Sequence, residues 1–300
     1  MGRALVGRSR DEGGSDATVA RKLPLALRFR SLLSRSCEAR VMKTRVIIDR
    51  LVVLALVLAG WELCSLYFGT IWFSSPLHVF TRFGEEIRNG DLFFQASYTL
   101  KAALYGALIG GIPAALLPFA LRRHPVAGAI LDPYFVGGYG VPKLALAPLF
   151  ILWFGVDVEP KVALVASIVS FLVFFSTTAG VNAVNAQYVS VARVFGASER
   201  DIARHIVWPG AIPYAFAGFR IAAPYAIGAA VVGELISSNR GLGFMIQSGA
   251  TDFDTTLVFV ALVTLTAVVV VINLVVGRCE RWLLRWRPPQ QTLTSRIVGT

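Results

Sequence analysis

The sequence is poor in charged residues. Only 16% of its 300 residues are charged, whereas an average globular protein has about a quarter, and 55% are hydrophobic. The mean hydropathy is +0.64. This balance excludes a disordered chain, a secreted disulfide scaffold and a cytosolic enzyme as leading interpretations. It predicts a membrane protein with several spans.

Cysteines, histidines and the sequence motifs of enzymes are also scarce. The three cysteines lie far apart without a Cys-x-x-Cys pair, and no two of the three histidines are close together in the sequence. We therefore expect no disulfide framework and no metal site. No Gly-Lys pair occurs, so the chain has no P-loop for ATP, and no Gly-x-Ser-x-Gly nucleophile motif occurs either. We expect no enzyme activity in this chain and no cofactor bound by it.

Six apolar segments are long enough to cross a bilayer, which takes about 20 residues. Because lipid offers no partners for backbone groups, such segments form helices, and the predicted fold class is an all-α membrane protein with six transmembrane helices. Gly106 and Gly110 in the second segment predict close helix packing. In the third segment, glycines and prolines predict an irregular helix, with Asp132 and Lys143 on one face. The segments are residues 47–68, 102–121, 126–154, 162–180, 211–236 and 257–277.

The connections between these segments predict the topology. Of the 29 Lys and Arg residues, 22 fall in the termini and in the connections on the same side as the termini, and four fall on the other side. Positive charge is retained in the cytoplasm, so both termini are expected there, and this topology explains the basic composition without nucleic acid. On the outer side, residues 76–95 are expected to form a short amphipathic helix, either on the membrane surface or as a solvated connection.

The expected organisation has three parts. Residues 1–45 form a basic, disordered cytoplasmic tail, residues 46–280 form the six-helix membrane domain, and residues 281–300 form a second cytoplasmic tail. An alternative hypothesis places the start of translation at Met42, directly before the first span.

The connection between the fourth and fifth spans, about residues 182–209, is the most informative. It predicts two short helices broken near Gly196, with Ser198 as the N-cap of the second helix and Asp201 three residues further on. Pro209 is expected to end that helix. The segment is either a tight cytoplasmic turn or a docking knob for a soluble partner.

This connection resembles the EAA loop in the permease subunits of ABC importers. The similar runs are residues 192–198 and 206–213, and two further runs, residues 141–155 and 233–244, resemble the nitrate, sulfonate and taurine branch of that family. The resemblance covers roughly residues 45–288. Ser190 stands where the family has its glutamate, which puts in doubt any salt bridge that this glutamate makes in relatives. Trp208 replaces a common leucine.

The resemblance implies a type I ABC importer permease in a bacterial inner membrane. It implies two ATPase subunits that bind ATP and Mg and receive this loop, a second permease copy that forms a homodimer, and a periplasmic or lipid-anchored substrate-binding protein. The solute would be small and polar or anionic, of the sulfonate, taurine, nitrate or thiamine-precursor type. An ion-gradient-driven secondary transporter is the alternative. The implied coupling residues are Ser190, Ala192, Arg193, Gly196, Ala197, Ser198, Asp201 and Pro209.

The fifth span carries two charged residues, Arg220 and Glu234. They are 14 residues apart, nearly four helical turns, with Pro224 between them on nearly the same face. Ionisable residues inside a membrane are costly, so this face is predicted to line the translocation pathway. Arg220 would attract an anion or brace the inner gate. The alternative is that Arg220 extends to the inner surface and Glu234 lies at the outer interface.

Overall fold

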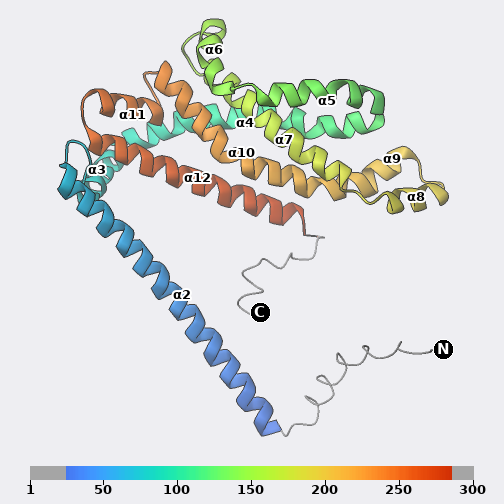
Figure 1. Cartoon of the computed structure of the whole chain (residues 1–300), viewed down its shortest axis with the longest axis horizontal. Coiled ribbons are helices and arrows are strands. Elements are labelled where there is room, and N and C mark those ends of the chain that lie inside the picture. The colour runs from blue at the N-terminus through green and yellow to red at the C-terminus, as the bar shows by residue number, and fades with distance from the viewer. Residues whose placement is uncertain (1–24, 286–300) are drawn as a thin grey trace, which may run out of the picture. The chain divides into compact units, whose positions relative to one another are not determined.

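The computed structural model describes residues 25–285, with side chains from residue 45 onward. All regular structure in this range is helical (Figure 1). The chain divides into two units, and residues 61–288 form the second unit, which contains the helical bundle. Residues 1–24 and 286–300, where the ends of the predicted tails fall, lie outside the described residues.

The first described helix, α2, spans Leu25–Phe68 and begins well before the predicted span. Residues 25–45 are therefore helical, in contrast to the disordered tail that the composition suggests. No glycine or proline occurs between residues 25 and 59, so nothing in the local sequence interrupts the helix.

The remaining helices follow in close succession. They are α3 (Pro76–Asn89), α4 (Asp91–Arg123), α5 (Pro125–Gly140), the 3-10 turn η1 (Lys143–Leu146), α6 (Ala147–Phe154), α7 (Glu159–Asn182), α8 (Ala186–Val194), α9 (Glu199–Ile202), the π-helical segment η2 (Ala203–Val207), α10 (Trp208–Ile236), α11 (Leu242–Thr251) and α12 (Thr255–Leu283).

Within the described residues, five helical segments are long and apolar enough to cross a membrane, and a bent pair makes a sixth if it counts as one span. This agrees with the six predicted spans. The five segments are Arg45–Phe68, Asp91–Arg123, Glu159–Asn182, Glu199–Ile236 and Thr255–Leu283.

The bent pair corresponds to the third predicted span and turns by 80° between Pro125–Gly140 and Lys143–Phe154. Pro142 disfavours a helical conformation of the residue before it, and Val141 is extended. The Lys143 ammonium group turns back to donate hydrogen bonds to the carbonyls of Gly138 (3.0 Å) and Tyr139 (2.9 Å) at the end of α5. Asp132 and Lys143 are thus not on one helical face, because the helix ends between them.

The predicted amphipathic helix ends earlier than residue 95. α3 stops at Asn89, Gly90 adopts a left-handed conformation with φ of 82°, and α4 starts at Asp91. Val79 on α3 is buried in a cluster with Leu242, Met245 and Val260 from α11 and α12. Part of the apolar face of α3 is therefore covered by protein.

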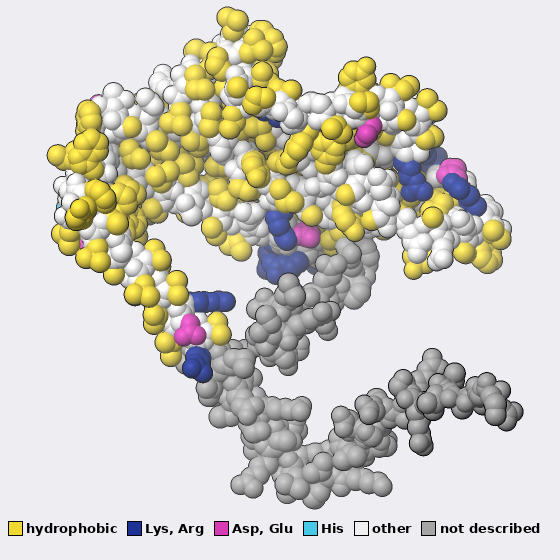
Figure 2. Space-filling view, in the orientation of Figure 1, with side chains coloured by type: hydrophobic (Ala, Val, Ile, Leu, Met, Phe, Trp, Pro, Cys, Tyr) yellow, Lys and Arg dark blue, Asp and Glu magenta, His cyan; other side chains and the backbone are white. Residues whose placement is uncertain are grey.

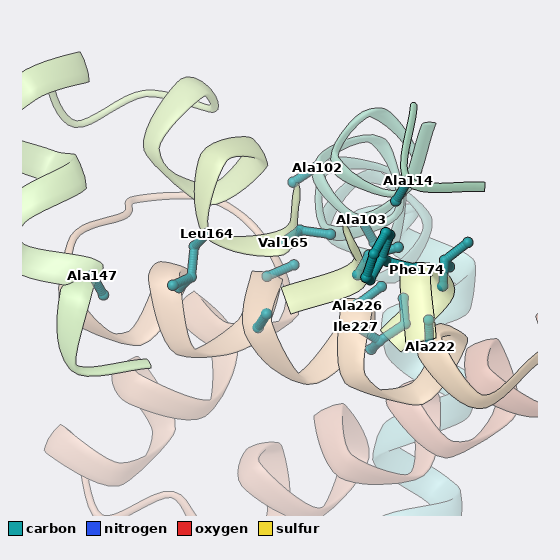
Figure 3. Close-up of a cluster of buried hydrophobic side chains, with 14 residues drawn as sticks. Ala102, Ala103, Ala114, Ala147, Leu164, Val165, Phe174, Ala222, Ala226 and Ile227 are labelled. Carbon is teal, nitrogen blue, oxygen red and sulfur yellow. The ribbon is translucent and has the colours of Figure 1, made fainter. Parts of the chain in front are cut away.

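The main core lies where α4, α7 and α10 pack together (Figure 3). Small side chains dominate it, including Ala102, Ala103 and Ala226. A Cβ atom at Gly106 would overlap Val165, and one at Gly110 would overlap the backbone of Ala166. The predicted role of these two glycines in close helix packing is confirmed, because α4 approaches α7 through their missing side chains.

A second group of contacts fixes the start of α11. The Glu234 carboxylate on α10 accepts hydrogen bonds from the Thr99 hydroxyl (2.9 Å) and from the Gly243 amide (2.8 Å). Thr99 accepts from the Leu242 amide at 2.9 Å, and the side chain of Gln95 accepts from the Gly241 amide at 2.5 Å. We call Gln95, Thr99 and Glu234 the α11 clamp.

The α11 clamp solves a general problem of helix ends. The first amide groups of a helix have no partner within the helix, and here α4 and α10 supply three acceptors for them. Glu234 and Thr99 are each only 1% exposed. Gly241 has φ of 105°, and a Cβ atom there would overlap the Glu234 carboxylate, so this close approach requires glycine.

We predict that Glu234→Ala destabilises the protein and that Glu234→Gln largely does not. Alanine leaves the buried Thr99 and Gly243 donors without an acceptor, which costs about 1–3 kcal/mol for each buried group, whereas glutamine keeps an oxygen at the same reach. The melting temperature in detergent should fall by about 2–4 °C for each kcal/mol lost. Glu85→Ala, which removes an exposed carboxylate on α3, is the control. Equal melting temperatures for Glu234→Ala and Glu85→Ala would contradict the role of the clamp.

Candidate coupling loop and translocation face

The connection between α7 and α10 forms the predicted pair of short helices. Asn185 caps α8 by accepting a hydrogen bond from the Gln187 amide at 2.8 Å. Ser198 caps α9, and its hydroxyl and the Asp201 carboxylate exchange hydrogen bonds with the backbone in a capping box. The predicted N-cap and its partner are confirmed. Both caps hold helices that are too short to be stable alone.

The break between the two helices is a compact turn at Gly196. Its φ is +81°, a conformation that glycine adopts without strain. The amide of Ala197 donates to the carbonyl of Ala192 (3.0 Å), and the amide of Gly196 donates to that of Arg193 (2.9 Å). These two bonds form a Schellman motif, which ends α8 and satisfies its last carbonyls.

The outer side of this turn is apolar and open. Val194 is 86% exposed and Phe195 is 85% exposed, and both lie directly before Gly196. Tyr188 and Val191 on α8 are also exposed. We call these four residues the loop tip; Figure 2 shows hydrophobic side chains over α8 at this end of the bundle. They are absent from the coupling residues predicted from the sequence, and no local signal distinguishes them, because apolar residues recur throughout residues 182–209.

The inner side of the loop is anchored in the bundle. Val189 of α8, Ile202 of α9 and Val207 of η2 are buried in one cluster with Val181 of α7 and Ala211 of α10. Ala192 and Ala197 pack partly against this cluster. The loop is thus held in position from within, while its tip stays uncovered.

Pro209 does not end the second helix. α9, η2 and α10 follow one another without a break, so that Glu199–Ile236 is a single helical segment of 38 residues. η2 is a π-helical turn in which the amide of Trp208 donates to the carbonyl of Ala203, five residues earlier. Pro209 then occupies the first turn of α10. The wider turn before it allows the helix to continue past a residue that would otherwise interrupt it.

The position of the missing EAA glutamate is open to solvent. Ser190 is exposed on α8. Arg193 donates from Nε to the Glu199 carboxylate at 2.7 Å, so an ion pair crosses the Gly196 turn. Trp208, at the position of the family's leucine, packs its ring 4.9 Å from that of Phe119 on α4.

The two charged residues of α10 lie in different surroundings. Arg220 is partly exposed and forms an ion pair with Glu280 of α12. Pro224 is exposed one turn further on. Glu234, in contrast, is buried in the α11 clamp. This burial disagrees with the prediction that Glu234 lines the pathway, and we keep Arg220 and Pro224 as pathway candidates.

Among the residues that the structure describes, no group of His, Cys, Asp or Glu is arranged to hold a metal ion.

Comparisons with known proteins agree with this architecture. A family described as "binding-protein-dependent transport system inner membrane component" matches residues 106–287, which include the loop, the Gly196 turn and the α11 clamp residue Glu234. The chain is 34% identical to the riboflavin transport system permease protein RibX of Chloroflexus aurantiacus, over 71% of this chain and 79% of that protein. It is 30% identical to the putative aliphatic sulfonates transport permease protein SsuC of Escherichia coli, over 77% of this chain and 89% of that protein.

The fold also matches a solved structure. An inward-facing structure of the MetNI methionine ABC transporter superposes with a TM-score of 0.52 at 17% identity, covering 64% of this chain and 93% of that chain. The fold is thus that of type I ABC importer permeases, and nothing in these similarities supports an ion-gradient-driven secondary transporter. The chain belongs to the family of binding-protein-dependent transport system inner membrane components, and it is the membrane-spanning permease subunit of an ABC importer.

Proposed function

We propose that residues 182–209 couple this permease to its ATPase and that the loop tip is the surface the ATPase covers. The observation that carries the proposal is the exposure of Val194 and Phe195 at the Gly196 turn. Burying an exposed valine or phenylalanine side chain contributes about 1.5–3 kcal/mol. Exposed large apolar side chains on a rigid turn are typical of a site that a partner covers.

The loop is prepared for binding by its own hydrogen bonds. The capping box at Ser198 and the Schellman motif at Gly196 hold the tip in one conformation before the partner arrives. Less conformational entropy is then lost on docking. The Arg193–Glu199 ion pair and Arg200 lie beside the tip and supply a polar rim.

Movement of the loop is transmitted along one helical segment. Because Glu199–Ile236 is continuous, a displacement of α9 shifts α10, which carries Arg220 and Pro224. We propose that ATP binding and hydrolysis on the partner bias two arrangements of this segment, and that Arg220 and Glu280 form a brace between α10 and α12 in one of them. This chain binds no cofactor itself in the proposal; ATP and Mg are held by the partner.

The proposed assembly has two copies of this permease, two ATPase subunits and a periplasmic or lipid-anchored binding protein, in a bacterial inner membrane. Both termini and the coupling loop lie in the cytoplasm, which the excess of Lys and Arg on that side supports. The solute is small and polar or anionic, of the sulfonate, taurine, nitrate or thiamine-precursor type. The similarity to SsuC supports a sulfonate.

Val194→Ser with Phe195→Ser is expected to abolish co-purification of the ATPase from native membranes in mild detergent. The two substitutions remove the apolar tip and leave the Gly196 turn intact, so the loop keeps its shape and loses its contact surface. Gly196→Val should have the same effect by another route, because a β-branched residue is strained at the left-handed φ of this position. Phe80→Ser, at an exposed phenylalanine on α3, is the matched control. An ATPase that stays bound to the Val194→Ser, Phe195→Ser variant would contradict the proposal.

Arg220→Glu should lower ATP-dependent uptake into proteoliposomes at least tenfold, because it places two carboxylates together between α10 and α12. The double variant Arg220→Glu, Glu280→Arg restores an ion pair and should recover most of the uptake. Recovery distinguishes a brace from a site that attracts an anion, since the latter would remain inactive after the exchange. No recovery in a correctly assembled double variant would disprove the brace.

The reconstituted importer with its cognate binding protein should take up a labelled alkanesulfonate, taurine, nitrate or a thiamine-type pyrimidine precursor in an ATP-dependent and saturable manner. Titration of the binding protein with the same panel, followed by calorimetry, should give micromolar or tighter binding for one member. Riboflavin belongs in the panel because of the similarity to RibX. Uptake of riboflavin alone would overturn the assignment to a small anion.

A further inference from the structure

A cavity of about 800 Å³ lies beside the coupling loop. One wall is the end of α4, with Arg122 and Arg123, and the other is formed by α9, η2 and the start of α10, with Arg200 and Arg204. Figure 2 shows dark blue side chains gathered at this end of the bundle, near α9. The cavity therefore lies between α4 and the helices that follow the Gly196 turn.

The charge of this cavity is strongly unbalanced. Among residues 45–285, four arginines line it, and Glu199 is the one carboxylate in its wall. That carboxylate already accepts a hydrogen bond from Arg193 at 2.7 Å, outside the cavity lining. The lining thus attracts a ligand with negative charge.

Arg122 gives a more specific indication. Its Nη1 atom is buried and has no hydrogen-bond partner among the residues that the structure describes. A buried charged donor without an acceptor is costly, and phosphate and carboxylate oxygens are the acceptors with which a guanidinium group forms strong bidentate hydrogen bonds. Arg122 lines a neighbouring cavity with Asp132 as well, so its guanidinium group adds positive charge to the cavity by the coupling loop without belonging to it alone.

The remaining lining is apolar. Leu116, Phe119 and Ala120 of α4 face Val207 and Trp208 across the cavity, and the Phe119 and Trp208 rings lie 4.9 Å apart. Trp208 is partly exposed. A tryptophan beside arginines, where apolar helices end, is typical of the membrane–water interface. A free anion would need only the arginines, whereas a lipid would use both parts of the lining.

We propose that this cavity binds the headgroup of an anionic phospholipid from the cytoplasmic leaflet. The phosphate contacts Arg122 and Arg204, and an acyl chain lies along Phe119 and Trp208. Basic pockets between helices on the cytoplasmic side are known to bind such headgroups. The inference rests on the orientation in the proposed function. Because the ligand joins α4 to α9 and η2, it would steady the coupling loop from the membrane side.

The test is native mass spectrometry of the intact importer, exchanged from detergent into phosphatidylcholine nanodiscs with or without about 30% phosphatidylglycerol. The wild type should retain phosphatidylglycerol after release from the nanodisc. Arg122→Gln with Arg123→Gln, and separately Arg204→Gln, should lower the lipid-bound fraction roughly tenfold. Inorganic phosphate at millimolar concentration should not displace the lipid, because it cannot use the apolar part of the cavity.

Arg278→Gln with Arg285→Gln is the matched control, since it removes two charges from the end of α12 outside the cavity. Equal phosphatidylglycerol retention in the cavity variants and this control would overturn the inference, as would full displacement by phosphate. The outcome is independent of the proposed function: an importer that keeps ATP-dependent uptake but shows no specific lipid would refute only the lipid site. A chain that retains the lipid but binds no ATPase would refute only the coupling proposal.

Discussion

Close packing between α4 and α7 is the contact on which the rest of the structure depends. In a membrane, helices gain little from leaving lipid for protein, so they associate through van der Waals contact at short range. Gly106 and Gly110 permit that range, because side chains there would overlap Val165 and Ala166. α10 completes the core with alanines at its contact face. Because this core depends on short distances between helix backbones, a side chain added at either glycine would push α4 and α7 apart.

Polar side chains then hold α11 and α12 against this core. The α11 clamp ties a short helix to α4 and α10 through buried hydrogen bonds, and the Arg220–Glu280 pair ties α12 to α10. Both contacts join segments distant in sequence, and α10 takes part in each. The contacts differ in accessibility: the clamp is closed to solvent, whereas the ion pair is partly open. A helix that must move is better held by a partly exposed ion pair than by buried hydrogen bonds, because water can replace the broken contact.

Much of this arrangement could be predicted from the sequence. Hydropathy predicted six spans, and local signals predicted the two short helices, the Ser198 cap and the turn at Gly196. The surroundings of Glu234 could not be predicted, since its partner Thr99 is 135 residues away and periodicity along one helix carries no information on which neighbour covers a face. The π-helical turn and the exposure of Phe195 were missed for the same reason. Both depend on how the loop packs against α4 and α7.

The π-helical turn at Ala203–Val207 has a geometric consequence for the loop. A π turn holds one residue more than an α turn of the same path, and each residue of an α-helix corresponds to about 100° of rotation and 1.5 Å of rise. The extra residue therefore sets the angle at which the loop tip projects relative to the faces of α10. One inserted residue thus sets the rotational offset between α9 and α10. The direction in which Arg220 faces α12 is fixed within α10, whereas the direction of the loop tip, which precedes Glu199, also depends on this inserted residue.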